Sequence, residues 1–317
     1  MKLLRNALLG AIMAVTCGAA FAASDTGIPV DKTPYKNREV LPDFTKDMCG
    51  IANPTLTHVK DNIYRHTNNQ GLAVHSGLVM VTKEGALVVD AGITCASEWL
   101  NKEIKKRFNV PVKYVVLTHG HADHIAGSEV FQRDGATVVA NQRAIEPIVG
   151  EKLPYAIPDR VFDKEMEIKL GGETVKLYRV NPSHSDNMTM VLFPRQKALQ
   201  CTDVCQNKTM PFNDFLDFYY TGWLETLDWV IAQDVDVIDV GHYNLATRED
   251  QVALRRYMVD LHRQVLDLTR KGMAWDELYR NIKYSDEVRG WTNFNTMRVL
   301  NAQGMYRWVS NRRRGNY

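Results

Sequence analysis

The sequence of 317 residues has almost no excess of charge of either sign, since 39 basic residues stand against 37 acidic ones. Subtracting Lys2 and Arg5, which lie in a segment that we expect to be removed, leaves 37 of each. A balanced chain lacks the basic surface that binds nucleic acid or anionic membranes. After its first residues the chain also lacks internal repeats and any apolar run of the ~20 residues that span a bilayer. We therefore expect a soluble protein that binds no nucleic acid and has no stable membrane insertion.

Low-complexity segments are also missing from the chain. Hydrophobic residues make up 45% of it and charged residues 24%, a composition that can bury a large core. Disordered and collagen-like classes are thereby excluded. The length indicates one large domain or two ordinary ones, and it leaves the oligomeric state open.

The first 22 residues contain the three parts of a secretory signal. Lys2 and Arg5 precede an apolar run over residues 7–15, and Ala20-Phe21-Ala22 supplies the small residues of a cleavage site. Cys17 is not preceded by the Leu and the small residue expected before a lipidated cysteine. We therefore predict that residues 1–22 form a signal peptide, cleaved after Ala22, and that the protein is periplasmic or secreted.

Cysteine is scarce, and four cysteines remain after this cleavage: Cys49, Cys95, Cys201 and Cys205. An oxidising compartment favours disulfides. Four cysteines allow three pairings, and spacing alone does not choose among them. Cys201 and Cys205 are close enough in sequence to pair locally, whereas a chain this long can also fold with four buried free thiols. Both outcomes stay open from the sequence.

Apolar periodicity along the mature chain predicts an α/β fold. Residues 23–54 are polar and contain three prolines, which predicts an extended N-terminal arm. Alternating or continuous apolar runs predict strands at 56–66, 78–82, 86–89, 114–117, 137–139, 166–169, 174–180, 189–193, 198–201 and 235–240. Helical spacing predicts helices at 99–108, at 124–133 and from Thr247, where Thr247 and Asp250 can form a capping box. The rest of residues 246–317 is expected to be mostly helical.

Histidine is concentrated in one short segment, Thr118-His119-Gly120-His121-Ala122-Asp123-His124, directly after a predicted buried strand. Imidazole is the commonest metal ligand in proteins, and a neighbouring carboxylate suits a divalent ion. Small residues between the histidines allow the side chains to converge. Three histidines and an aspartate within six residues therefore indicate a metal site.

The pattern His119-x-His121-x-Asp123-His124 after a hydrophobic strand resembles the signature of the metallo-β-lactamase superfamily. Further positions match the family in order: Asp90-x-Gly92, His184, Asp203 and His242. One position departs from it, because Thr202 precedes Asp203 where the family usually has Gly. The resemblance implies an αββα sandwich over residues 55–245, followed by a C-terminal helical extension over 246–317.

The resemblance also implies a site for two Zn²⁺ ions per chain, although other divalent metals such as Fe or Mn suit the same ligands. One ion would be held by His119, His121 and His184, and the other by Asp123, His124 and His242. Asp203 would bridge the two ions, and Asp90 would orient a ligand histidine from the second layer. Catalytic roles would fall to Asp203 and to Asp123, which could help to move protons. The remaining histidines, His58, His66, His75 and His262, are predicted to be structural.

The implied activity is that of an exported dinuclear zinc hydrolase, in which a metal-bridging hydroxide cleaves an ester, lactone, thioester or similar bond of a small-molecule substrate. The layout has a weak resemblance to quinoprotein-associated and sulfur-oxidation-linked zinc hydrolases. One alternative is a β-lactamase that hydrolyses β-lactam antibiotics; those enzymes generally lack the bridging Asp and carry Cys or Ser nearby, as Cys201 is here. A mononuclear iron enzyme similar to persulfide dioxygenases, and a non-enzymatic metal-binding protein, are further alternatives.

Aromatic residues between Asp203 and His242 are candidates for contacts with the substrate. This segment joins two predicted ligands and has to pass near the site. A tyrosine hydroxyl there could donate a hydrogen bond to a developing oxyanion. The candidates in this segment are Tyr219, Tyr220 and Phe215, although the helical spacing of the Phe residues favours a place in the core. Tyr155, which lies outside this segment, is a further candidate.

We predict that the mature protein begins at Ala23. N-terminal sequencing of the exported protein should return Ala-Ser-Asp-Thr from Ala23 onward. An intact Met1, or a lipidated Cys17 at the terminus, would show that the signal was assigned wrongly.

Overall fold

Strands with few exposed residues form the centre of the computed structural model, which describes residues 24–71 and 73–311. All five residues of β6 (Gly85–Val89) are buried, for example. Two sheets stack face to face, and their facing side chains form one hydrophobic layer that includes Leu87, Val116, Leu177 and Phe193. The predicted signal segment and its cleavage point lie outside the described residues.

The larger sheet has eight strands. Their spatial order is β2 (Ile28–Pro29), β9 (Arg160–Phe162), β8 (Thr137–Asn141), β7 (Val112–Val116), β6, β5 (Val74–Thr82), β4 (Ile63–Asn69) and β3 (Thr55–Lys60). Strands β6 to β9 pair in parallel, whereas β3 to β6 form an antiparallel meander.

The smaller sheet has six strands. Their order is β1 (Ser24–Asp25), β10 (Glu165–Leu170), β11 (Glu173–Arg179), β12 (Thr189–Phe193), β13 (Ala198–Gln200) and β14 (Val237–Asp239). Its one parallel pair is β13 with β14. The carboxyl ends of β6 and β7 in one sheet, and of β13 and β14 in the other, can therefore each present loops at a common edge.

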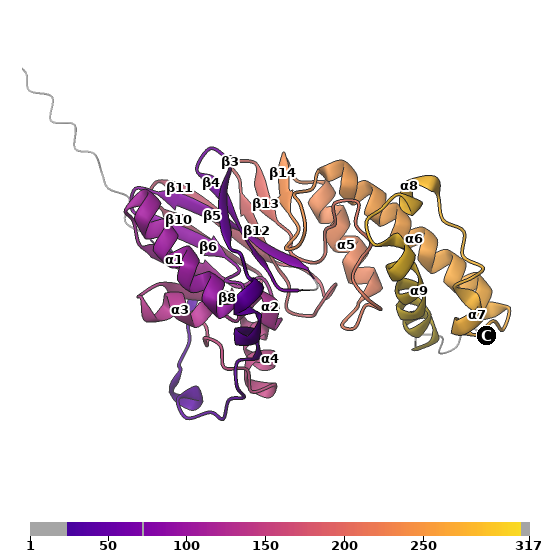
Figure 1. The fold of residues 1–317 in the computed structure, drawn as a ribbon, viewed down its shortest axis with the longest axis horizontal. Coiled ribbons are helices and arrows are strands. Elements are labelled where there is room, and N and C mark those ends of the chain that lie inside the picture. Colours follow the sequence, from indigo (N-terminus) through magenta and orange to yellow (C-terminus); the bar gives the residue numbers. More distant parts are fainter. Residues whose placement is uncertain (1–23, 72, 312–317) are drawn as a thin grey trace, which may run out of the picture.

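Helices cover the outer faces of both sheets (Figure 1). On the larger sheet these are α1 (Thr94–Phe108), α2 (Ala122–Ile125), α3 (Ser128–Arg133) and α4 (Ile145–Gly150), with η3 (Gln142–Ala144) before α4. On the smaller sheet they are α5 (Tyr220–Ile231) and α6 (Arg248–Arg270), followed by α7 (Trp275–Leu278), α8 (Asp286–Arg289) and α9 (Phe294–Asn311). This arrangement confirms the predicted αββα sandwich with a C-terminal helical region. None of the helices in the described ranges has the length and hydropathy needed to cross a bilayer.

Helix α6 begins where the sequence predicts it. The Thr247 hydroxyl accepts a hydrogen bond from the Asp250 backbone N–H at 3.2 Å, and the Asp250 carboxylate accepts one from the Thr247 N–H at 2.8 Å. This capping box satisfies two N–H groups that a helix start leaves without partners. The stripe of Leu254, Met258 and Leu261 is buried against the smaller-sheet side of the core.

Two predicted elements are each divided in the structure. The strand predicted at 56–66 is two strands, β3 and β4, because the chain turns at Asp61, whose φ is +49°. The helix predicted at 124–133 is interrupted at Gly127 between α2 and α3. A Cβ at Gly127 would lie 1.9 Å from the Ser97 hydroxyl on α1, so the interruption occurs where two segments pack too closely for a side chain.

The predicted arm is more ordered than an extended segment. Besides β1, β2 and η1 (Thr33–Tyr35), it contains the 3-10 helix η2 (Phe44–Ile51), whose first turn is capped by the Asp43 carboxylate. A disulfide between Cys49 of η2 and Cys95 of α1 fixes this segment to the larger-sheet side. A second disulfide joins Cys201 and Cys205, so the structure selects two disulfides over four free thiols.

A buried ion pair connects the two sheets close to their common edge. The Arg65 guanidinium on β4 donates to the Asp239 carboxylate at the end of β14 at 2.6 Å, and both side chains are almost inaccessible. Asp239 also accepts hydrogen bonds from the Ser76 hydroxyl and from the Gly241 backbone N–H. Arg65 therefore neutralises a charge that would otherwise be buried without a cation.

We predict that Arg65→Met lowers the free energy of unfolding by about 3–5 kcal/mol, because it leaves Asp239 charged and buried without its cation. Urea unfolding followed by circular dichroism measures this loss. The control is Arg255→Met, which breaks the exposed pair with Asp228 and should cost no more than about 1 kcal/mol. Equal losses for the two variants would contradict the special role of the buried pair.

Candidate metal centre

Four loops bring the predicted ligand residues to the common edge of the two sheets. The first follows β7, the second lies between β11 and β12, and the third and fourth follow β13 and β14. These loops carry the seven predicted ligands His119, His121, Asp123, His124, His184, Asp203 and His242, which fall into adjoining groups of possible metal-binding residues. Residues more than 120 positions apart in the chain are thus collected by the sheet topology.

Asp90, at the end of β6, holds the beginning of the histidine-rich loop. Its carboxylate accepts hydrogen bonds from the Thr118 backbone N–H at 2.9 Å and from the Thr118 hydroxyl at 2.8 Å. The Thr202 hydroxyl donates a further bond to it at 3.0 Å and accepts one from the Gln200 amide. The departure from Gly at position 202 therefore supplies a hydroxyl that links the two strand ends through Asp90.

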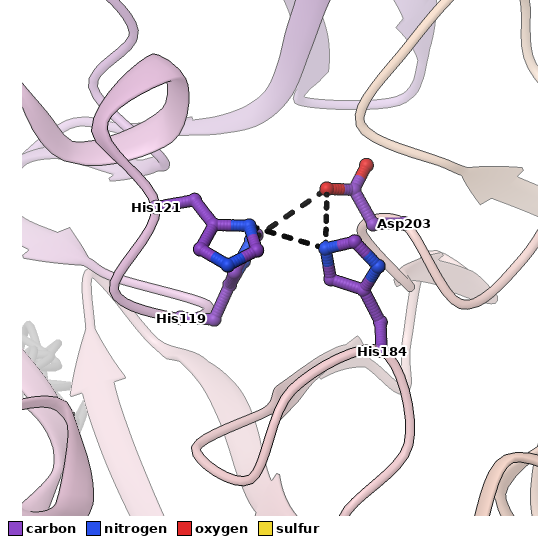
Figure 2. Close-up of side chains that lie close together, drawn as sticks. All are labelled: His119, His121, His184 and Asp203. Atoms are coloured by element: carbon purple, nitrogen blue, oxygen red, sulfur yellow. Dashed lines mark hydrogen bonds and ion pairs between the residues drawn. The ribbon is translucent and has the colours of Figure 1, made fainter. Parts of the chain in front are cut away.

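The first group of predicted ligands consists of His119, His121, His184 and Asp203, whose side chains point toward one another in Figure 2. One Asp203 oxygen, Oδ2, lies 3.5 Å from His119 Nε2 and 3.3 Å from His184 Nε2. The nitrogen of His121 that faces the group is Nδ1, which lies 3.2 Å from His184 Nε2.

The second group consists of Asp123, His124 and His242. His124 Nε2 lies 3.2 Å from Asp123 Oδ2 and 3.2 Å from Asp203 Oδ2. His242 Nε2 lies 3.4 Å from Asp123 Oδ2 and 3.2 Å from the other Asp203 oxygen, Oδ1. Asp203 therefore contacts both groups and stands between them.

The donor atoms have the properties that a cation site requires. His119 Nε2 and His124 Nε2 are both inaccessible to solvent and form no hydrogen bond of regular geometry among the described residues, although each lies within 3.5 Å of an Asp203 oxygen. Buried imidazole nitrogens normally have well-formed hydrogen bonds, so the convergence of these two on a carboxylate needs an explanation. Divalent metal ions fit this set, because imidazole nitrogen and carboxylate oxygen are the ligands that zinc and similar ions take.

Burial and the close packing of charges pull the pKa values of this cluster apart. Burial lowers the pKa of His184 to about 4 and lowers the pKa of His119 well below its usual value. Burial also opposes ionisation of Asp203, but His124, His242 and His184 outweigh it and lower the Asp203 pKa. Burial likewise opposes protonation of His242, but Asp203 and Asp123 outweigh it and raise the His242 pKa to about 10.

These shifts describe a cluster of ionised carboxylates that needs positive charge beside it. When no other cation is present, protons on His124 and His242 supply that charge. A bound divalent ion takes the place of such protons, so metal binding should release protons.

The remaining predicted residues lie in two kinds of surroundings. Asp90 Oδ2 is 3.5 Å from His124 Nδ1, the nitrogen that faces away from Asp123. The side chains of Phe215 and Tyr220 are instead packed in the hydrophobic core beside α5, where Phe215 stacks on Phe218 and Tyr220 on His262.

The other two predicted tyrosines differ in exposure. Tyr155 is buried against the larger-sheet helices, and burial raises its pKa. Tyr219 is partly exposed and directly precedes α5, and its backbone N–H donates to the Ser183 carbonyl next to His184. A contact between Tyr219 and the substrate stays a prediction.

Two residues beside the centre were not identified from the sequence. His75, which the sequence predicts to be structural, lies beside the centre: its ring centroid is 4.9 Å from that of His124, and its buried Nε2 has no partner among the described residues. The Asp217 carboxylate accepts from His121 Nε2 at 2.9 Å. Asp217 lies in the aromatic segment between Asp203 and His242. The sequence signal for its role was that it is an acidic residue in a segment that has to pass near the site.

Comparison with known proteins agrees with this geometry. The sequence profile of the metallo-beta-lactamase superfamily matches residues 70–242, which is more than half of the chain. The chain belongs to this superfamily. Its members are metal-dependent hydrolases, and this chain is therefore a metal-dependent hydrolase.

Individual relatives of this superfamily member are distant and varied. A type 2 metallo-beta-lactamase of Bacillus cereus is 25% identical over 210 residues, which cover 61% of this chain and 78% of that protein. A linear primary-alkylsulfatase of a Pseudomonas species is 22% identical over 268 residues, which cover 67% of this chain but 50% of that protein. A solved metallo-beta-lactamase structure from Pontibacter korlensis has a TM-score of 0.59 and 22% identity, covering 65% of this chain and 99% of that one. This structural likeness supports the fold.

We predict that His121→Ala abolishes turnover and removes one bound metal ion, while the fold remains, because the ring lies on a loop outside the sheet core. Metal analysis and circular dichroism of the purified variant measure the two effects. His58→Ala is the control, since His58 is exposed on β3, where its ring bonds to the Asp61 carbonyl and packs edge-on against Tyr64, and it belongs to neither ligand group. Near-normal turnover of His121→Ala would contradict its role as a ligand.

Proposed function

We propose that this protein is an exported hydrolase that uses two zinc ions to cleave an ester, lactone, thioester or similar bond of a small molecule. The observation that carries the proposal is the position of Asp203, whose Oδ2 faces His119, His184 and His124 while its Oδ1 faces His242. A carboxylate that contacts both ligand groups can hold two ions close together. The predicted signal segment and the two disulfides support an oxidising compartment outside the cytoplasm.

Two bound divalent ions would supply a nucleophilic water with a pKa near 7 and would polarise the substrate oxygen. His119, His121 and His184 would hold one ion, and Asp123, His124 and His242 the other, with Asp203 between them. Asp123 has the most accessible carboxylate of the group, with 39% of its side chain exposed. We propose that the Asp123 carboxylate, besides its place among the ligands, helps to move protons between the centre and solvent.

Exposed apolar side chains on the loop that carries Asp217 support a substrate with an apolar group. The loop between Asp203 and α5 exposes Phe212 to 55% and Leu216 to 73%, and Leu216 directly precedes the Asp217 that contacts His121. Large exposed apolar side chains next to a site are typical of substrate contact. Relatives include proteins named as an alkylsulfatase and as an O-demethylase subunit, so the family accommodates more than one bond type.

The β-lactamase alternative depends on Cys201 as a ligand in place of Asp203. Cys201 is bonded to Cys205, so its sulfur is not available as a thiolate. Asp203, two residues later, is the side chain that faces the histidines. This observation favours the bridging carboxylate, even though relatives named as metallo-beta-lactamases are among those most similar in sequence.

Metal analysis of the purified protein, combined with a hydrolysis screen across ester, lactone, thioester and β-lactam substrates, tests the proposal. Two zinc ions per chain and turnover of the first three classes are expected. One iron per chain would instead support the persulfide dioxygenase alternative, and turnover confined to β-lactams would support the antibiotic-hydrolysing one.

We predict that Asp203→Asn reduces the metal content from two ions to nearly one and lowers turnover about 10–100-fold or more, the range seen when support of a metal site is lost. The asparagine keeps the shape of the side chain but not the charge that offsets metal–metal repulsion. Asp234→Asn is the matched control, because Asp234 forms, among the residues that the structure describes, only an exposed side-chain pair with Lys197. If Asp203→Asn kept two ions while Cys201→Ala lost one, the cysteine-ligand alternative would be correct.

A further inference from the structure

The contact between His121 and Asp217 has a particular orientation. His121 Nδ1 faces the ligand group, 3.2 Å from His184 Nε2, and the opposite ring nitrogen, Nε2, donates to Asp217 Oδ2 at 2.9 Å. A carboxylate on the outer nitrogen of a metal-ligating histidine fixes the ring, selects the tautomer and makes the inner nitrogen more basic. Asp217 is therefore placed to fix the ring orientation and tautomer of His121, although it is not itself a proposed ligand.

Asp217 belongs to a loop that needs support from elsewhere. Residues 211–218 form no helix or strand, and Asn213 and Phe215 both have left-handed backbone conformations, with φ of +55° and +57°. Such conformations are costly for residues other than glycine and persist only where surrounding contacts enforce them.

Helix α9 supplies these contacts. The Arg307 guanidinium donates to the Asp214 carboxylate at 2.6 Å and to the carbonyls of Asp214 and Phe215 at 2.7 and 3.0 Å. One turn and a half earlier, the buried Asn301 amide donates to the carbonyls of Pro211 and Asn213. Both loop residues with strained backbones thus have their carbonyl groups held by α9.

Two further features fix α9 against this loop. A Cβ at Gly304 would lie 2.0 Å from the Asp214 carbonyl oxygen, so the helix and the loop approach too closely for any side chain. Helix α9 is also held to α6, because the Asn301 side chain accepts a hydrogen bond from the Tyr257 hydroxyl of α6 at 2.9 Å. The loop is therefore bound to the helical layer rather than to the sheets that carry the ligands.

We propose that Asp217 is a positioning residue for the metal ligand His121, and that the C-terminal helix α9 sets the metal affinity of the centre by holding the loop that carries Asp217. This inference rests on the proposed metal centre. It assigns to the C-terminal helical region a role at the site, although none of the seven proposed ligands comes from that region.

The test measures zinc affinity by competition with a chromophoric chelator in wild-type protein, Asp217→Ala, Asp217→Asn and Arg307→Met. Asp217→Ala should weaken one of the two ions about 10–100-fold, the range for lost second-layer partners. Asp217→Asn keeps an acceptor oxygen and should recover part of the loss. Arg307→Met should weaken the same ion by less than Asp217→Ala, and should shift the visible spectrum of the cobalt-substituted protein in the same direction.

The double variant Asp217→Ala/Arg307→Met decides whether α9 acts through Asp217. If it does, Arg307→Met should add little to the loss already caused by Asp217→Ala, because groups acting along one path are not additive. A full additional loss in the double variant, or a wild-type affinity in Arg307→Met, would overturn the role of α9. Wild-type affinity in Asp217→Ala would overturn the role of Asp217.

Two controls separate this inference from other outcomes. Arg298→Met removes the same charge from α9 at a residue that lies over the Phe294 ring of its own helix, and should keep wild-type affinity. Gly304→Ala should lower metal affinity by displacing the loop without removing charge, and retention of the wild-type value would count against the proposal. Failure of the wild-type protein to bind two zinc ions would instead refute the proposed function, before any variant is compared.

Discussion

Five imidazoles and two carboxylates share one edge of the sandwich, and the electrostatic balance of this cluster constrains the structure around it. Asp203 is almost buried and lies within 3.5 Å of four histidine nitrogens. Its negative charge is tolerated there only because positive charge stands beside it, as protons or as metal ions. Since the strength of such interactions depends steeply on distance in a buried site, every ligand has to be held in place by its own neighbours.

Two other buried carboxylates provide much of this support. Asp90 connects Thr118, which begins the histidine-rich loop, with Thr202, which precedes Asp203. Asp239 connects Arg65 and Ser76 of the larger sheet with Gly241, which precedes His242. Each of these aspartates therefore links an element of the larger sheet to a ligand loop of the smaller one. The two sheets are thus held in register at the edge where their loops carry the proposed ligands.

The parts of this arrangement that the sequence predicts are those encoded over short distances. The spacing of the histidines from His119 to His124 is enough to predict a metal site, and Thr247 with Asp250 is enough to predict the start of α6. The role of Asp217 depends on a contact with His121, 96 positions earlier, and on α9, whose Arg307 follows 90 positions later. Nothing in the local pattern around Asp217 contains that information. The sequence predicts a structural His75 for the same reason, because its position beside His124 comes from the pairing of β5 within the sheet and from its bridge to His242.

The Cys49–Cys95 disulfide has its main effect on the unfolded chain. It closes a loop with a sequence separation of 46 residues, and the whole antiparallel meander from β3 to β6 lies inside this loop. In the chain-entropy description, a closure of this length disfavours the unfolded ensemble by about 4 kcal/mol. The left-handed backbones of Asp90 and Asp203, with φ of +53° and +60°, act in the opposite direction, at about 1–3 kcal/mol for each such residue. A covalent bond outside the metal centre thus gives the native state a margin against the backbone strain of Asp90 and Asp203 at the centre.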